Sequence, residues 1–308
     1  MFTADAHCDT LFAIAVHGID PSELSVTAAR LEAGNVGLQT LAMFAGGRGM
    51  SDHPYEKGVA MLNSRHKVGI PVIDGDLPAE PPATPHGVLS IEGGEILEGS
   101  LERLREFDGV SRIRMIALTW NNENEIGYPA KNDCGLGLKP FGKALLHEMD
   151  RLGVLPDVSH LNEKGFWDIA ETAQLPPIAS HSNLKKLCGH SRNLTDEQVK
   201  CIVEKKGYIG VNFYSNFLRD DGQATLDDVL RHIDGIAELG GIDVLGFGSD
   251  FDGIESWPEG LGNPSDFPNL LELLSKHGYT QDDIAKIAGL NLWNVMKRAE
   301  DMRQHDNR

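Results

Sequence analysis

Residues 154–180 read VLPDVSHLNEKGFWDIAETAQLPPIAS and place a helical pattern between two short apolar runs. The runs Val154–Ser159 and Pro177–Ser180 are typical of buried strands, and residues 161–173 have the spacing of an amphipathic helix. A strand, a helix and a second strand in this order predict a parallel β-α-β unit. The same alternation continues along the chain in both directions, which makes α/β the expected fold class.

Eight strand-like runs alternate with helical patterns, and several runs are apolar on both faces, as parallel strands covered on both sides are. The other six runs are Thr3–Cys8, Val36–Phe44, Gly87–Ile91, Ile113–Thr119, Tyr208–Phe213 and Val244–Ser249. Further helices are predicted at 141–152, 195–206 and 225–239, with a last one at about 280–300 that starts at Thr280. Eight alternations predict one (β/α)8 TIM barrel, a single domain over residues 1–308, with a C-terminal helical extension.

Two stretches do not fit the short connections of a minimal barrel. Residues 74–86 are rich in proline and are predicted to form a loop. Residues 121–139 are polar and rich in glycine, and they follow a predicted strand directly. Because active sites of such barrels lie where the strands end, this second stretch is expected to form a long loop over the site.

Composition excludes two classes of partner. The 308 residues include 28 Lys+Arg and 46 Asp+Glu, a formal net charge of −18. Nucleic acids and anionic membrane surfaces both require basic protein surfaces, so neither is expected as a partner. No stretch reaches the ~18 apolar residues that cross a bilayer, and MFTADAHCDT at the start does not resemble a signal peptide. The four scattered cysteines favour a reducing, cytoplasmic location; they are Cys8, Cys134, Cys188 and Cys201.

Histidines and carboxylates occupy the C-terminal ends of five predicted strands. His7 and Asp9 are two residues apart and share one face of the first strand, whereas Cys8 points away and is predicted to be a core residue. The other four ends carry Glu92, His160, His181 and Asp250. Any one of these residues could be a simple capping or hydrogen-bonding group. Together, three histidines and three carboxylates on one barrel face predict a two-metal site with a bridging carboxylate and an acid/base group.

The sequence also resembles a known family. The motifs HCDT, LSIEGG, LTWNNENEIG, DVSH, ASHS, SRN, VNFY and GFGSDFDG occur in the order and approximate spacing of the membrane dipeptidase (renal dipeptidase) family of binuclear zinc peptidases. The chain is similar to bacterial-type soluble members, and the resemblance runs from the first ten residues to the C-terminal helix. It implies an amidohydrolase-like (β/α)8 barrel that binds two Zn²⁺ and acts on small dipeptides. Members are often dimers, so the resemblance is compatible with a homodimer.

The resemblance implies a role for each metal ligand. His7 and Asp9 would bind the first zinc ion, and Glu92 would bridge both ions. His160 and His181 would bind the second zinc ion. These assignments agree with the residue types that the strand ends supply, since imidazole and carboxylate groups are ordinary zinc ligands.

It also implies roles in catalysis and substrate binding. Asp250 matches the family's catalytic aspartate. Arg192 matches the arginine that holds the substrate's carboxylate, for which a guanidinium fork is well suited. Its neighbour Asn193 and Tyr214 of VNFY are further candidates for substrate contacts, although Tyr214 could equally pack at the barrel rim. Trp120 stands where many members have a histidine that polarises the scissile carbonyl, and indole does not titrate. That contact would then pass to a nearby Asn or to the metal alone.

We therefore expect a metal-dependent dipeptidase in which a hydroxide bridging two zinc ions attacks the amide carbonyl and Asp250 transfers the proton. One alternative is another binuclear metallohydrolase acting on lactones, cyclic amides or phosphoesters, which would not need Arg192. The other is a metal-binding barrel without turnover. Asp252 is expected to support the DFDG turn. The remaining histidines are predicted to lie outside the site: His17, His53, His66, His86, His147, His190, His232, His277 and His305.

Overall fold

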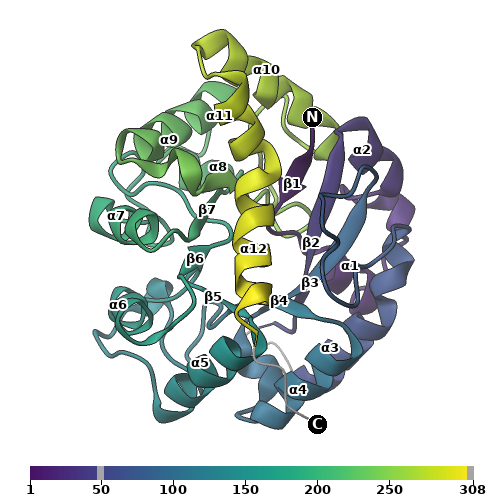
Figure 1. Cartoon of the computed structure of the whole chain (residues 1–308), viewed down its shortest axis with the longest axis vertical. Helices are drawn as coiled ribbons and strands as arrows, with labels where there is room; N and C mark the ends of the chain where they lie inside the picture. The colour runs from purple at the N-terminus through teal and green to yellow at the C-terminus, as the bar shows by residue number, and fades with distance from the viewer. Residues whose placement is uncertain (47–51, 304–308) are drawn as a thin grey trace.

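Eight parallel strands form a closed barrel in chain order in a computed structural model that describes residues 1–46 and 52–303 (Figure 1). The strands are β1 (Thr3–Asp5), β2 (Val36–Phe44), β3 (His86–Glu92), β4 (Ile113–Ala117), β5 (Leu155–Asp157), β6 (Ile178–Ala179), β7 (Tyr208–Val211) and β8 (Leu245–Phe247). The barrel closes through parallel pairing of Asp5 in β1 with Phe247 in β8. The predicted (β/α)8 architecture is confirmed.

Several strands end earlier than their apolar runs predict. The first run extends to Cys8, but β1 ends at Asp5 and Cys8 forms only an isolated bridge with Phe251. The strands β4 to β8 likewise end one or two residues before their runs, whereas β2 ends at Phe44 as predicted and β3 extends to Glu92. The candidate site residues therefore lie at or just beyond the ends of the regular strands, as described below.

Helices surround the barrel (Figure 1). They are α1 (Thr10–Ala15), α2 (Ala28–Ala33), α3 (Pro54–Ser64), α4 (Leu101–Val110), α5 (Pro140–Leu152), α6 (Glu163–Thr172), α7 (Asp196–Glu204), α8 (Ser215–Leu218), α9 (Leu226–Glu238), α10 (Phe267–His277), α11 (Gln281–Ala285) and α12 (Asn291–Asp301). The four helices predicted between strands correspond to α5, α6, α7 and α9. Short 3-10 turns lie at Pro21–Glu23, Arg65–Val68, Gly94–Leu97, Ala130–Asn132, Gly241–Asp243 and Pro264–Asp266.

Local sequence signals set the helix ends. At the start of α7, the Gln198 backbone N–H donates to Thr195 Oγ1 at 3.2 Å, and the Thr195 backbone N–H donates to Gln198 Oε1 at 2.9 Å. This reciprocal capping box satisfies two backbone donors that the first helical turn leaves unpaired. At the C-terminal end of α5, the backbone of Gly153 has φ 68°, a left-handed conformation that glycine adopts without steric cost.

The C-terminal helix closes the end of the barrel where the strands begin. The predicted helix at 280–300 is α11, a π-helical turn at Lys286–Leu290, and α12. In Figure 1, α12 crosses the centre of the ring of strands. Its apolar residues Leu292, Trp293 and Met296 are buried together with residues near the strand starts, which are Ala4, Leu38, Val88, Met115, Leu155, Ile178 and Tyr208. The opposite end is left for ligands.

The connecting loops follow the sequence pattern. The proline-rich segment 74–85 contains no helix or ladder strand, and β3 starts at His86. The segment that follows β4 contains one short 3-10 turn, at Ala130–Asn132. Within residues 1–46 and 52–303, the structure contains no helix that is both long and apolar enough to cross a membrane.

Candidate active site

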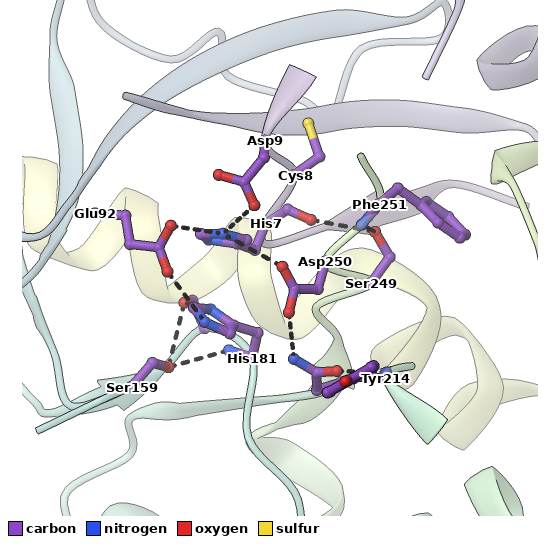
Figure 2. Close-up of polar contacts among 12 residues, drawn as sticks. His7, Cys8, Asp9, Glu92, Ser159, His181, Tyr214, Ser249, Asp250 and Phe251 are labelled. Atoms are coloured by element: carbon purple, nitrogen blue, oxygen red, sulfur yellow. Dashed lines mark hydrogen bonds and ion pairs between the residues drawn. The ribbon is translucent and has the colours of Figure 1, made fainter. Parts of the chain in front are cut away.

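The six side chains predicted from the strand ends converge at the C-terminal end of the barrel, where Figure 2 shows His7, Asp9, Glu92, His181 and Asp250, and His160 contacts Glu92. His7 Nε2 lies 3.5 Å from Asp9 Oδ2, 3.5 Å from Glu92 Oε2 and 3.9 Å from Asp250 Oδ1. The other oxygen of Glu92, Oε1, lies 2.9 Å from His160 Nε2 and 3.5 Å from His181 Nε2. Glu92 therefore sits between two ligand groups and directs one oxygen to each.

Sharp backbone turns direct two of these side chains into the site. His160 and Asp250 have φ values of 68° and 65°, in the left-handed region that side chains other than glycine rarely adopt. Such a conformation costs about 1–3 kcal/mol and persists only where neighbours enforce it. The His160 carbonyl accepts from Ala130 N at 2.7 Å, and the Asp250 N–H donates to His7 O at 3.2 Å. Both turns are thus held by adjacent loops.

Hydrogen bonds at Nδ1 orient His160 and His181 so that the Nε2 atom of each ring faces Glu92. His160 Nδ1 lies 3.1 Å from Asn121 Oδ1, which can only accept. His181 Nδ1 lies 2.7 Å from Ser180 Oγ, and that hydroxyl donates to Asp157. His160 Nε2 lies 2.9 Å from Glu92 Oε1 and 3.0 Å from His181 Nε2. With a divalent ion bound at both Nε2 atoms, each ring would carry its proton on Nδ1, the arrangement of metal-ligating histidines.

Burial and neighbouring charges keep these two rings neutral. Burial, followed by the Arg192 guanidinium, lowers the pKa of His160 to about 4. Burial, followed by the charges of His7 and Arg192, holds the pKa of His181 well below its ordinary value. At neutral pH both imidazoles are unprotonated, which is the form that binds metal.

The carboxylates around His7 favour a positive charge at this position. Burial lowers the pKa of His7, but Glu92 and Asp9 outweigh burial and hold it well above its ordinary value. Burial alone would raise the pKa of Glu92, yet His7 and His160 hold it well below its usual range. Burial, with Glu92 nearby, raises the pKa of Asp9 to about 7. A cation here would stabilise all three groups in their ligating forms.

Two buried polar atoms of the site lack hydrogen-bond partners. His7 Nε2 and Asp9 Oδ1 are buried and accept or donate no hydrogen bond among the described residues. Orphaned buried polar atoms are costly unless a ligand satisfies them. The ligand atoms of His7, Glu92 and His181, and those of His7, Asp9 and Asp250, lie within 4.8 Å of one another. This nitrogen and oxygen donor set fits divalent ions such as zinc.

A cavity of about 350 Å³ opens beside these groups. Asp9, Glu92, His160 and Asp250 line it, as do the predicted substrate-contact candidates Trp120 and Tyr214. The predicted loop after β4 contributes Asn121 to the wall. A larger hollow of about 460 Å³ lies between the N-terminus and the prolines at 81–85 and contains no candidate ligand. We assign the active site to the smaller cavity, because the titratable groups converge there.

Arg192 and Asn193 do not line this cavity but lie next to it. The Arg192 guanidinium lies 5.4 Å from the centre of the Phe217 ring, which does line it. It donates to Ser182 Oγ and to His181 O, each at 3.3 Å. Asn193 Nδ2 donates to the carbonyls of Cys188 and Phe217. Asn193 therefore positions this loop, and the structure gives it no contact with the cavity.

Sequence reasoning missed three residues that position the site. Asn212 Nδ2 donates to Asp250 Oδ2 at 2.9 Å and fixes that carboxylate. A Cβ atom on Gly253 would lie 1.9 Å from Asp9 Oδ2, so only glycine fits there. Phe44 lines the cavity from the end of β2. Asn212 belongs to VNFY and Gly253 to DFDG, so both motifs contain more of the site than their matched residues.

The remaining expectations concern supporting residues. The Cys8 thiol is buried, points away from the ligands (Figure 2) and donates to Thr40 O at 3.3 Å, as predicted. Asp252 accepts from Thr10 Oγ1 and Ser25 N, both at 2.7 Å, which ties the DFDG turn to two other segments. His232 bonds Leu184 N and Leu218 O inside the fold. His17, predicted to lie away from the site, instead lines the cavity. His305 lies outside the described residues.

A further buried carboxyl, that of Glu95, lies three residues after Glu92. Its side chain is 8% exposed, and Oε1 has no hydrogen-bond partner within the described ranges. Burial raises the pKa of Glu95 to about 7 despite the hydrogen bond that Oε2 accepts from Asn124 at 3.1 Å. The folded state therefore prefers the protonated acid, and ionisation lowers the free energy of unfolding as the pH rises from about 4.5 to about 7.

Glu95→Gln should remove this pH-dependent cost. We expect the free energy of unfolding to rise by about 1–3 kcal/mol at pH 8 and to change little at pH 4.5, because Gln stays neutral and can still accept from Asn124. Urea unfolding of the wild type and of Glu95→Gln at both pH values measures this difference in the free energy of unfolding. Glu80→Gln, an exposed residue in the loop before β3 that is not among the groups shifting the pKa of Glu95, is the matched control and should have no effect at either pH. Equal changes at both pH values would contradict the interpretation.

Comparison with known proteins identifies relatives. The family model described as membrane dipeptidase (peptidase family M19) matches residues 85–308. An uncharacterized protein in the pqqA 5′ region of Klebsiella pneumoniae is 38% identical over 220 residues, 68% of this chain and 80% of that protein. An uncharacterized dipeptidase of Schizosaccharomyces pombe is 34% identical over 219 residues, 69% of this chain and 52% of that protein.

The fold matches solved structures over nearly its whole length. The crystal structure of the dipeptidase AC, a metallo peptidase of family M19, superposes with a TM-score of 0.87 at 25% identity. The match covers 97% of this chain and 98% of the other. The similarity therefore includes the β1 and β2 segments that precede the residues matched by the family model.

Proposed function

The chain belongs to the membrane dipeptidase family, peptidase family M19, and from that premise we propose how it acts as a metal-dependent dipeptidase. Two Zn²⁺ ions would be held by His7, Asp9, Glu92, His160 and His181. The observation that carries the proposal is the position of Glu92, whose two oxygens face separate ligand groups at 2.9–3.5 Å. A carboxylate in that position suits a bridge between two ions.

Bound divalent ions would supply Lewis acidity toward the scissile carbonyl and lower the pKa of a water molecule. The protein's part is to orient substrate and move protons. Asp250 lines the cavity; its Oδ1 lies 3.9 Å from His7 Nε2, while Oδ2 accepts from Asn212. Burial raises the pKa of Asp250, so the carboxyl can take a proton from water and release it to the leaving amine.

Arg192 would hold the free carboxylate of the dipeptide. The side chain is 5% exposed, and its Nε has no partner in the described part of the chain. Burial lowers its pKa to about 10 even though Asp250 and Glu92 oppose the shift. A buried cation bonded only to neutral groups is costly, and a substrate carboxylate would compensate it. Tyr214, whose hydroxyl donates to Glu255 Oε1 at 2.6 Å, would border the same end of the substrate.

Trp120 changes how the carbonyl is polarised. Its ring centre lies 6.2 Å from that of His160, so the residue is next to the ligands, but indole carries no charge. The Asn121 oxygen is bonded to His160 Nδ1. Polarisation would therefore depend on the ions themselves.

We also propose a cytoplasmic location. All four cysteines, which lie within the described residues, are free thiols. This agrees with a reducing compartment. The homodimer stays a prediction, which light scattering of the purified protein would test.

A substrate panel tests the proposed reaction. Zinc-loaded protein is assayed with dipeptides, lactones, cyclic amides and phosphate esters. We expect hydrolysis of dipeptides and little turnover of the other classes, because only dipeptides place a carboxylate one residue beyond the scissile bond for Arg192. Preferred turnover of a lactone or phosphate ester would favour the alternative metallohydrolase, and no turnover of any class would favour a non-catalytic barrel.

A further inference from the structure

We propose that an aromatic wall, formed by Phe12, Phe44 and Trp120, binds the side chain of the dipeptide's N-terminal residue and selects apolar, above all aromatic, side chains. The inference rests on the proposed function and specifies its substrate class. The wall is part of the active-site cavity, since all three residues line it.

The wall is continuous although its residues come from three parts of the chain. Phe12 belongs to α1, Phe44 ends β2, and Trp120 follows β4. The ring centres of Phe12 and Phe44 are 5.0 Å apart, with planes at 57°, and those of Phe44 and Trp120 are also 5.0 Å apart, at 53°. These are the separations and tilts of favourable aromatic contacts. Ala13, Ile19 and Leu24 extend the apolar surface within the cavity.

The wall lies across the barrel from the proposed carboxylate site. Arg192 follows β6 and contacts Ser182 and the carbonyl of His181. In a closed barrel with strand order β1 to β8, β2 is the strand diametrically opposite β6. Phe44 is the last residue of β2. The candidate metal ligands follow or end β1, β3, β5 and β6 and meet at the barrel mouth, where Figure 2 shows His7, Asp9, Glu92 and His181 side by side.

This placement fixes the direction of a bound dipeptide. If Arg192 holds the C-terminal carboxylate and the scissile carbonyl is at the metal ligands, the remaining part of the substrate is its N-terminal residue. That residue must extend away from Arg192, toward β2 and the aromatic wall. The C-terminal side chain lies on the Arg192 side, near Tyr214 and Phe217.

The chemistry of the wall favours apolar groups. Phe12 and Trp120 are partly exposed to the cavity, so a substrate side chain can cover apolar surface that is otherwise in water. The carboxylates of the cavity lining are in the proposed metal and proton-transfer groups (Asp9, Glu92, Asp250) or are hydrogen-bonded elsewhere (Asp252 to Thr10, Glu255 to Tyr214). The polar residues next to the wall are His17, which packs edge-on against Phe12 at 4.8 Å, and Asn121, the neighbour of Trp120 in the chain. Neither supplies a carboxylate, lysine or arginine for an acidic or basic side chain, which would lose hydration without gaining a partner.

Two series of dipeptides test the proposal on the zinc-loaded enzyme. The first varies the N-terminal residue (Phe-Gly, Leu-Gly, Ala-Gly, Asp-Gly, Lys-Gly), and the second varies the C-terminal residue (Gly-Phe, Gly-Leu, Gly-Ala). We expect kcat/KM for Phe-Gly to exceed that for Ala-Gly roughly 10–100-fold, as hydrophobic pockets discriminate, with Asp-Gly and Lys-Gly below Ala-Gly. The C-terminal series should span a narrower range.

Variants of the wall separate binding from a structural role. Trp120→Ala and Phe44→Ala should each lower the Phe-Gly to Ala-Gly ratio roughly 10-fold, mainly through KM, and Phe44→Leu should keep most of the ratio. Trp167→Phe changes an aromatic residue of α6 that does not line the cavity and should leave the ratio unchanged. Both kcat/KM values are measured on the same preparation. A lower fraction of folded protein therefore reduces both values equally and leaves their ratio unchanged.

The outcomes distinguish this inference from the function on which it rests. Failure of the zinc-loaded protein to cleave any dipeptide in either series would overturn the proposed function. Cleavage of dipeptides with equal kcat/KM for Phe-Gly and Ala-Gly would overturn only the aromatic-wall proposal. So would a preference that persists unchanged in both Trp120→Ala and Phe44→Ala.

Discussion

Asp250→Asn is expected to lower kcat by roughly 10²–10⁴ while the protein keeps its metal ions, the usual effect of removing a positioned acid/base group. The amide oxygen of Asn can still accept from Asn212, as Asp250 Oδ2 does at 2.9 Å. An amide cannot take up and release a proton, however, so both proton transfers would lose their carrier. The five proposed metal ligands are unchanged in this variant, and the ions should remain.

Metal content and steady-state kinetics of the same preparation check this expectation. Asp227→Asn, an exposed residue in the first turn of α9, is the matched control and should leave kcat and metal content unchanged. Loss of the ions in Asp250→Asn would show that this carboxylate is a structural ligand, which its 3.9 Å separation from His7 Nε2 would then explain. An unchanged kcat would contradict the proton-transfer role.

Arg192→Ala is expected to lower kcat/KM for free dipeptides by roughly 30–3,000-fold. This range corresponds to about 2–5 kcal/mol for truncating one partner of a buried, hydrogen-bonded charge pair. The same variant should have little effect on a dipeptide whose C-terminus is amidated, because that substrate has no carboxylate. The wild-type enzyme should disfavour the amidated substrate by a similar factor.

The comparison requires both substrates and a second variant. Arg192 also donates to Ser182 and to the carbonyl of His181, so replacement by Ala also removes a contact with a proposed metal ligand. Arg192→Lys keeps the charge without the planar fork and should retain an intermediate preference for the free carboxylate. Wild-type enzyme that cleaves free and amidated dipeptides equally well would show that the carboxylate is not held by Arg192.

Sequence periodicity was sufficient for the barrel because parallel strands buried on both faces produce short apolar runs that helices separate. It was also sufficient to place candidate site residues at one end of the barrel, since Glu92, His160, His181 and Asp250 directly follow such runs and His7 is the last but one residue of the first run. The strand limits were less well predicted: the first run extends to Cys8, but β1 ends at Asp5 and pairing resumes only as an isolated bridge between Cys8 and Phe251. The hydrophobicity of the residues does not indicate where the regular strand ends.

Contacts between distant segments could not be predicted from one sequence. The packing of Phe12, Phe44 and Trp120 depends on how α1, the end of β2 and the segment after β4 come together, and each residue alone resembles an ordinary core aromatic. Gly253 is required because Asp9, 244 positions earlier, approaches the place of its missing Cβ. His17 reaches the cavity for the same reason, since the turn after α1 is set by tertiary packing.

The most direct test is elemental analysis of the purified protein for divalent metal, together with dipeptide hydrolysis before and after chelation. We expect about two ions per chain, loss of hydrolysis when a chelator removes them and recovery when zinc is returned, because Glu92 and the histidines around it form a ligand set for two ions. His160→Ala should retain about one ion fewer and lose most of its activity. Full dipeptidase activity in a metal-free preparation would contradict the proposed centre.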